Sequence, residues 1–154
     1  MDSIWKTDLV IAHTACLARS LKHWTGRELM PGVVVPAELA RAVFEAPFVV
    51  VSHGTEADPM LNYGNRAALT LWEMSWEELT HIPSRLTAEA PGREERAQLL
   101  GTVTRRGFID DYSGVRISKT GRRFRISRVT VWNLLTEDGR PCGQAAMFDR
   151  WEFL

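Results

Sequence analysis

The last part of the chain constrains the fold most, because from Phe108 onward its apolar residues take the two-residue period of β-strands. Two short loops interrupt this region, and each carries a glycine, Gly121 or Gly139, where a tight hairpin needs a left-handed residue. The segments around the loops read "FIDDYSGVRIS", "RRFRISRVTVWNLL" and "PCGQAAMFDRW". They predict a three-stranded antiparallel meander, and such a sheet needs other elements to cover it.

The preceding part of the chain supplies two more strands and several helices. Phe48–His53 is a continuous apolar run typical of a central strand, and "MLNY" predicts a short strand after a turn. Helices are predicted over Asp8–Trp24, Glu38–Glu45 and Arg66–Trp72, from Ser75 onward, and from near Pro91 to Gly107. This order predicts an α+β fold: a five-stranded antiparallel sheet with short helices on one face and an added N-terminal helix.

Several helix ends carry explicit signals. Asn65 is a good N-cap for the helix that follows it. Ser75, with Glu78 three residues later, forms a capping box. Gly26 lies just beyond the first helix, where a C-terminal glycine belongs. We therefore divide the chain into an N-terminal helical extension and linker, residues 1–36, and a domain, residues 37–154.

Composition and charge narrow the classes of function. The chain has 154 residues, 45% of them hydrophobic, which suits one soluble domain with a sizeable core. Its formal net charge is +0, so no global charge attracts it to nucleic acid or to an anionic membrane. No apolar run approaches the roughly 20 residues of a membrane-spanning helix. Asp2 and Asp8 stand where a signal peptide would be positive, so we expect a cytoplasmic protein with no membrane partner.

The cysteines and histidines predict no metal site. Cys16 and Cys142 fall in different predicted elements and form no C-x-x-C motif. Without a secretion signal, we expect buried thiols rather than a disulfide. The four histidines also lack the spacing of metal ligands.

The stretch from Met60 to Leu79 resembles the core of a PAS domain. There a short strand leads through an asparagine into a small helix and then into a helix with an acidic start, and "MLNYGNRAALTLWEMSWEEL" fits that pattern. The stretch "FEAPFVVVSHGTEADPMLNYGNRAALTLWEMSWEELTHIPSRLTAE", together with "GFIDDYSGVRIS" and "RRFRISRVTVWNLL", looks like the MEKHLA domain. This PAS-like module is found as small stand-alone bacterial proteins and at the C-terminus of class III homeodomain–leucine zipper plant factors. The resemblance spans Glu38 to Trp151 in several blocks.

The resemblance implies a sensing domain rather than a catalyst. PAS folds hold a small molecule or cofactor between the sheet and the short helices, or bind a protein partner on the sheet face. They also commonly dimerise through flanking helices. We therefore expect a small-molecule ligand or an unidentified protein partner, and a homodimer formed through the N-terminal helix. The apolar stripe Val10, Leu17, Leu21 and Trp24 fits this dimer and fits packing on the chain's own sheet equally well.

The cofactors of other PAS domains find little support in these residues. Photoactive flavin domains carry a reactive cysteine in the helical region, where this chain has "LTHIPSRLTAE". Haem-binding PAS domains usually take a histidine from the long helix before the meander, and Arg93–Arg106 contains none. His53 and His81 remain as haem-ligand candidates, but a lone histidine at a strand end or turn is more often structural. Covalent flavin and haem are both disfavoured, and the cofactor is left unknown.

Strict alternation along the central meander strand places every second residue from Phe124 to Leu134 on one face. Arg128 and Thr130 would be polar groups among apolar neighbours there, which suits a ligand pocket. The alternative is a solid core, with Arg128 reaching solvent or turned away by a bulge. The candidate ligand-binding residues are Tyr63, Asn65, Trp72, Trp76, Phe124, Ile126, Thr130, Trp132 and His53.

Two other classes of function stay open. An enzyme using the same pocket would need a reactive polar cluster, such as His53 near Thr130. Ser52 and His53 cannot form a nucleophile–base pair, because neighbours on a strand point to opposite faces. No catalytic residue is predicted. Alternatively, an exposed basic strip of Arg116, Arg123 and Arg125 could touch nucleic acid, although the balanced charge and the lack of a binding motif argue against it.

Overall fold

Within the described part of the chain, residues 3–154 without the side chains of residues 90 and 91, the fold is built on one antiparallel sheet of six strands. It is seen here in a computed structural model. The hydrogen-bonded order is β2-β1-β5-β4-β3, and β6 pairs with β4. The strands are β1 (Val49–His53), β2 (Leu61–Gly64), β3 (Phe108–Ile117), β4 (Arg123–Leu135), β5 (Pro141–Phe148) and β6 (Arg150–Phe153). The predicted α+β fold and its antiparallel sheet are confirmed, and β6 is an added strand.

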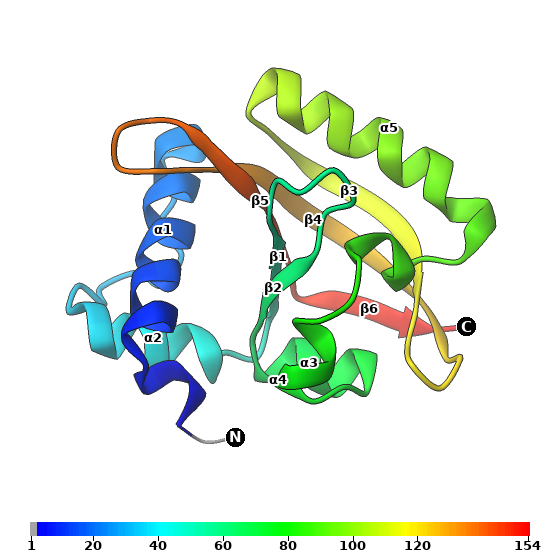
Figure 1. Ribbon diagram of the computed structural model, residues 1–154, viewed down its shortest axis with the longest axis horizontal. Coiled ribbons are helices and arrows are strands. Elements are labelled where there is room, and N and C mark those ends of the chain that lie inside the picture. The colour runs from blue at the N-terminus through cyan, green and yellow to red at the C-terminus, as the bar shows by residue number, and fades with distance from the viewer. Residues whose placement is uncertain (1–2) are drawn as a thin grey trace.

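Helices cover the sheet from both sides. α1 packs against β4 on one side, α5 lies against β3 and β4 on the other, and α3 and α4 contact β1 and β2 (Figure 1). No helix among the described residues combines the length and apolarity needed to cross a membrane. The helices are η1 (Ile4–Lys6), α1 (Asp8–Thr25), α2 (Pro36–Phe44), α3 (Arg66–Trp72), α4 (Trp76–Leu79), η2 (Ser84–Thr87) and α5 (Ala90–Arg106), where η marks a 3₁₀-helix.

α1 folds back on its own sheet. Gly26, in the left-handed conformation with φ of 74°, ends the helix as predicted. Leu17 and Leu21 are fully buried and belong to the same core cluster as Trp132 of β4. The apolar stripe therefore packs within the chain. The homodimer through this helix stays a prediction, and its contacts would have to come from other faces of the helix.

Asn65 ties three segments together at the start of α3. Its Oδ1 accepts the backbone N–H of Ala68 at 3.2 Å, which confirms the predicted N-cap. The same oxygen also accepts the N–H of Val50 at 3.1 Å. Its Nδ2 donates to the carbonyls of Val43 at 3.0 Å and Phe48 at 2.8 Å. Asn65 is fully buried, so it fixes the junction of α2, β1 and α3 as well as capping a helix.

The signals of the other helices are confirmed as well. Ser75 Oγ accepts the N–H of Glu78 at 3.1 Å, and Glu78 Oε1 accepts the N–H of Ser75 at 3.0 Å, which completes the capping box of α4. Gly107 ends α5 with φ of 97°. A Cβ atom on Gly107 would lie 2.4 Å from the ring of Trp24, so close packing also requires a glycine there.

The strict alternation predicted along β4 is wrong beyond Ser127. Arg128 has φ of 53°, in the left-handed region, and its side chain is exposed. This single residue turns the strand, so that the side chains after it change faces. The α5 face of the sheet takes Phe124, Ile126, Val129 and Val131, whereas Trp132 and Leu134 pack in the core cluster of α1.

The neighbouring strand is interrupted at the same level. The sequence predicts one strand from Pro141 to Trp151, but Asp149 separates β5 from β6. The two breaks lie opposite each other in the pairing of the strands. Thr130 of β4 pairs with Met147 of β5, and Ser127 of β4 pairs with Arg150 of β6. We refer to Arg128 and Asp149 together as the kink.

Cys16 of α1 and Cys142 of β5 lie side by side. Their Sγ atoms are 3.8 Å apart, and both are free, half-buried thiols. Burial and the neighbouring Cys16 thiol raise the pKa of Cys142. The sequence predicts free thiols, but their distance along the chain hides that they are neighbours.

Candidate ligand cavity

A cavity of about 60 Å³ lies on the α5 side of the sheet. All strands of the sheet except β6 line it, and α3, η2 and α5 contribute the rest. Much of the lining is apolar and includes Leu99, Leu100, Val129 and Val131. The polar side chains that matter for its chemistry are His53, Arg96, Tyr112, Arg116 and Gln144.

Two buried polar atoms of this lining have no hydrogen-bond partner, namely His53 Nε2 and Trp72 Nε1. His53 Nδ1 lies 2.9 Å from the carbonyl oxygen of Gly54, which can only accept, so Nδ1 carries the proton and Nε2 is a bare acceptor. Burial lowers the pKa of His53 and keeps the ring neutral at neutral pH. Trp72 Nε1 is a donor only. The cavity thus presents one free acceptor and one free donor.

Gln144 lies beside this pair but offers His53 no donor. Its Nε2 carries two protons and lies within hydrogen-bonding distance of three acceptors: Leu100 O at 3.1 Å, Thr104 Oγ1 at 3.0 Å and Asn133 Oδ1 at 3.0 Å. Asn133 Nδ2 in turn donates to Val103 O at 2.9 Å. These bonds attach the C-terminal half of α5 to β4 and β5, so Gln144 has its amide protons in use.

Two arginines line the cavity without a carboxylate partner. Arg116 of β3 is only 7% exposed, and its guanidinium donates to Val115 O at 2.9 Å and to Tyr112 Oη at 3.3 Å. Arg96 of α5 is half-buried. Burial, together with the nearby charge of Arg116, lowers the pKa of Arg96 to about 10. Among the described ion pairs, none includes Arg96 or Arg116.

The structure brings together only part of the predicted site. His53, Trp72 and Ile126 line the cavity. Phe124 packs edge-on against Trp72, with ring centroids 5.4 Å apart, in the same core cluster. These four residues share the α5 face of the sheet.

The other predicted residues lie elsewhere. Tyr63, Trp76 and Trp132 pack in the core cluster of α1, and Trp132 Nε1 donates to Leu17 O at 3.3 Å. Thr130 Oγ1 accepts from Arg27 at 3.3 Å, away from the cavity. Asn65 is the structural tie described above. The kink explains the separation of Thr130 and Trp132 from Phe124 and Ile126, because it reverses the face of the later residues.

Sequence reasoning missed Arg96, Tyr112, Arg116 and Gln144. One signal could have found Arg96: it stands in line with Leu99, Leu100 and Val103 at the helical spacing of three, four and seven residues. A charged residue at the end of an apolar helical stripe indicates a lined cavity. For Arg116, the signal is masked by irregular register in β3 between Ile109 and Gly114.

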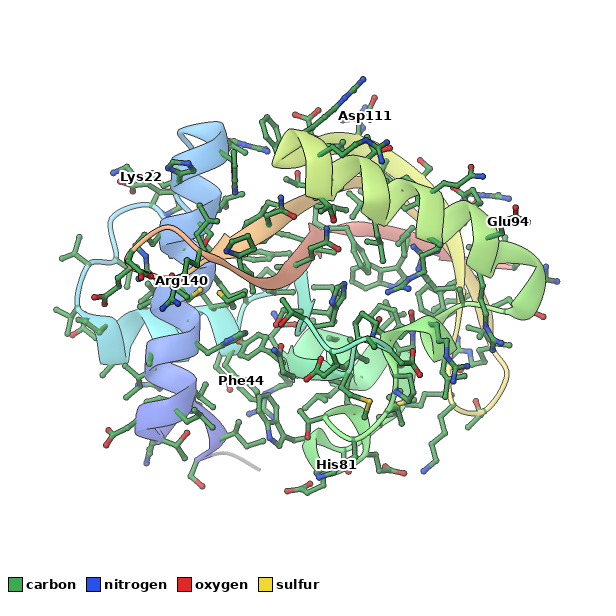
Figure 2. All side chains as sticks on the ribbon, turned by 45° about the horizontal axis from the view of Figure 1, so that its top comes forward. Lys22, Phe44, His81, Glu94, Asp111 and Arg140 are labelled. Carbon is green, nitrogen blue, oxygen red and sulfur yellow. The ribbon has the colours of Figure 1, made fainter. Side chains whose placement is uncertain are left out.

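The remaining cofactor candidates lie apart from the cavity or form no cluster. His81 is exposed, its Nδ1 hydrogen-bonds Glu77 O at 2.6 Å, and Figure 2 shows it at the periphery beyond α4. No group of three or more metal-ligating side chains occurs among the described residues. Cys16 and Cys142 belong to the periphery of the core cluster of α1, on the face opposite the cavity.

The enzyme hypothesis requires a reactive polar cluster such as His53 near Thr130, and these two residues do not come together. Ser52 and His53 point to opposite faces, as predicted: Ser52 Oγ, 2.8 Å from His13 Nε2, donates to Asn62 Oδ1 at 2.5 Å and is buried. His53 lines the cavity, whereas Thr130 does not.

The predicted basic strip is wrong, because its three arginines do not share one exposed face. Arg116 pairs across the sheet with Phe124 and lines the cavity, so it cannot join Arg123 and Arg125 on a solvent-exposed face. Arg123 and Arg125 instead form ion pairs with Glu89 at 2.6 Å and Glu152 at 3.9 Å.

This arrangement of sheet, short helices and cavity is that of a PAS-type fold. The PAS domain of a protein from Colwellia psychrerythraea superposes with a TM-score of 0.62 at 16% identity, covering 76% of this chain and 94% of that one. An RNA-binding light-oxygen-voltage receptor gives 0.64 at 19% identity, covering 77% of this chain and 34% of the receptor. A light-oxygen-voltage domain studied with a flavin analogue gives 0.60 at 15% identity, covering 76% and 84%.

Within that fold class, the sequence model of the MEKHLA domain matches residues 11–153. The chain belongs to the MEKHLA domain family. The homeobox-leucine zipper protein HOX10 from Oryza sativa subsp. indica is 26% identical over 96 residues, and so is that from subsp. japonica. The match spans 62% of this chain but only 11% of each rice protein. The family match begins inside α1 and therefore includes most of the helix that the sequence assigned to an extension.

Proposed function

We propose that this chain is a PAS-like sensory domain that binds a small molecule in the cavity beneath α5 and signals through binding rather than catalysis. The observation that carries the proposal is the pair of unpartnered buried atoms, His53 Nε2 and Trp72 Nε1. Each unsatisfied buried polar atom costs about 1–3 kcal/mol. A ligand or ordered waters in the cavity would satisfy both.

The size of the cavity limits what enters it. Its 60 Å³ leaves room for about four to six water-sized groups, whereas typical ligand pockets are about 300–1,000 Å³. A flavin or a haem therefore does not fit this arrangement of side chains. Among the described residues of α5, only Val103 is fully buried, so outward movement of the helix is the least costly way to enlarge the site.

Ligand-driven movement of α5 supplies a route to an output. A ligand that prefers the displaced helix shifts the population of that state by its differential affinity. The receiver would be a protein partner or a second copy of the chain; both stay predictions, as does the cytoplasmic location. Nothing among the described residues favours an enzyme over this function.

Native mass spectrometry of freshly purified protein, beside its ultraviolet–visible spectrum, tests the proposal. We expect an added mass that is lost on denaturation. Trp72→Phe removes the free donor and keeps most of the ring, so the variant should lose the added mass. Trp132→Phe is the matched control, because it removes a tryptophan N–H on the opposite face. Equal retention of the added mass by both variants would place the ligand elsewhere.

A further inference from the structure

The cavity has a positively charged wall. Arg96 comes from α5 and Arg116 from β3, and both line the same small cavity. Tyr112 lines it too, and its hydroxyl accepts a hydrogen bond from Arg116. Like charges held close together and withdrawn from water are unfavourable without a counter-charge. Neither guanidinium has a carboxylate partner among the described residues. The wall therefore lacks the anion that usually compensates such a pair.

The neighbouring acids lie outside the lining of the cavity. Glu94, on the same helix as Arg96, is exposed on the outer side of α5 (Figure 2). Glu56 lies near His53 rather than near the arginines, and its Oε1 accepts the N–H of Met60 at 3.1 Å. Glu89 pairs with Arg123 at 2.6 Å. No carboxylate of a described residue lines the cavity beside the positive wall.

The rest of the lining is apolar. Leu99 of α5 and Val129 and Val131 of β4 line the same cavity as the arginines. A ligand that fits both parts has an oxyanion at one end and a hydrocarbon body at the other. Arginine suits the first end, because its planar fork donates two parallel hydrogen bonds to a carboxylate. The small volume requires a short body.

We infer that the ligand of the cavity is a small carboxylic acid, with its carboxylate bound by Arg96 and Arg116 and its short apolar body packed on Leu99, Val129 and Val131. This inference rests on the proposed function, because it names the chemical class of ligand for the same cavity. It goes further in requiring the negative charge of the ligand. Inorganic phosphate shares the oxyanion chemistry but lacks the apolar body.

Titrations followed by two-dimensional ¹H–¹⁵N NMR test the charge and the body separately. The probes are butyrate, its neutral isostere butyramide, and inorganic phosphate. We expect butyrate to shift the resonances of cavity residues and to bind at least about tenfold more tightly than butyramide, because hydrogen bonds from arginine to a carboxylate are stronger than those to a neutral amide. Phosphate binding as tightly as butyrate would overturn the requirement for an apolar body.

Variants then assign the charge to its residue. Arg96→Gln should weaken butyrate binding by about tenfold to a hundredfold. Arg105→Gln on the same helix is the matched control, because Arg105 is exposed and lies outside the cavity lining. This variant should bind butyrate as tightly as the unaltered protein does. Arg116→Lys keeps the charge but loses the fork, so an intermediate affinity is expected. Amide spectra of the free variants show whether each one is folded.

The outcomes separate this inference from the proposed function. If butyramide binds as tightly as butyrate, or if Arg96→Gln leaves butyrate binding unchanged while Trp72→Phe abolishes it, the cavity binds ligands but not by their charge, and the inference is wrong. If no probe shifts cavity resonances and the purified protein carries no added mass, both the inference and the proposed function fail.

Discussion

The two faces of the sheet are covered by helices of opposite character. On one face, α1 buries Leu17 and Leu21 completely against Trp132, whose only polar atom is hydrogen-bonded. On the other, α5 leaves a cavity with two bare polar atoms and two arginines without counter-charges. The α1 face follows the rules of a stable core except at the Tyr63 hydroxyl, which has no hydrogen-bond partner. The α5 face departs from those rules at two polar atoms and two arginines.

Under the proposed function, this difference separates a structural layer from a ligand-binding layer within one small fold. Buried groups that are left unsatisfied lower stability, so they persist where binding compensates them. The polar network through Gln144 and Asn133 shows that the α5 face can satisfy its buried polar groups. In the described part of the chain, the unsatisfied buried side-chain atoms are His53 Nε2 and Trp72 Nε1 at the cavity, and the Tyr63 hydroxyl on the α1 face.

The largest expected effect comes from a matched pair of leucines. Leu17→Ala on the packed face should lower the free energy of unfolding by about 3–5 kcal/mol, because the rigid surroundings leave a void. Leu99→Ala on the cavity face should cost only about 1–2 kcal/mol, because Leu99 is half-buried and already borders empty space. Urea denaturation measures both, and equal losses would contradict the distinction between the faces.

The second-largest expected effect is a loss of stability in acid, caused by the buried ring of His13 in α1. Burial lowers the pKa of His13 from 6.5 to about 4. Between these values the unfolded chain binds a proton that the folded chain does not, so stability is lost as pH falls through this window, by about 3 kcal/mol in total. Urea titrations at several pH values measure the loss. His13→Gln should flatten the dependence, whereas the exposed control His81→Gln should leave it unchanged; the same slope in His13→Gln would remove this assignment.

The third-largest expected effect is the loss of stability when the hydrogen bonds of Asn65 are removed. A cap alone is worth about 1 kcal/mol. Asn65→Ala also leaves the buried N–H of Val50 unpaired, so we expect a loss of about 2–3 kcal/mol by thermal and urea denaturation. Ser75→Ala removes an exposed cap of the same kind and should cost only about 1 kcal/mol. A loss at Asn65 no larger than that at Ser75 would show that its long-range bonds add nothing.

The smallest effect has the opposite sign. In ligand-free protein, Arg96→Met should leave stability unchanged or raise it by up to about 1 kcal/mol, because it removes an uncompensated charge and keeps an apolar stem. Arg105→Met, at an exposed position of the same helix, should change nothing measurable. A clear loss of stability in Arg96→Met would mean that this arginine is structural and would weaken the comparison of the two faces.

The parts of the fold that could be predicted are those fixed by local chemistry. The N-cap at Asn65, the capping box of Ser75 and Glu78, and the glycine stops at Gly26 and Gly107 each depend on a few adjacent residues. The hairpins follow from short glycine-containing loops in the same way. These features need no information about the rest of the chain.

The lining of the candidate cavity can be predicted only in part, because it depends on long-range register. His53 and Trp72 line the cavity, as their predicted places in the fold suggest, whereas Thr130 lies outside the lining and Trp132 packs on the α1 face. The local sequence does not predict the left-handed backbone of Arg128, because glycine and asparagine are the residues that usually adopt this conformation. Arg96 and Arg116 come together only through the packing of α5 on β3.

The kink at Arg128 also has a consequence for comparing relatives of this chain. An alignment that inserts or removes a single residue near position 128 records a minor length change. In three dimensions, the same event would exchange inside for outside along the rest of β4, placing Trp132 where Val131 now faces the cavity. Homologous columns downstream of that point would then hold residues from different layers. Positional equivalence in this family should therefore be judged on each side of the kink separately.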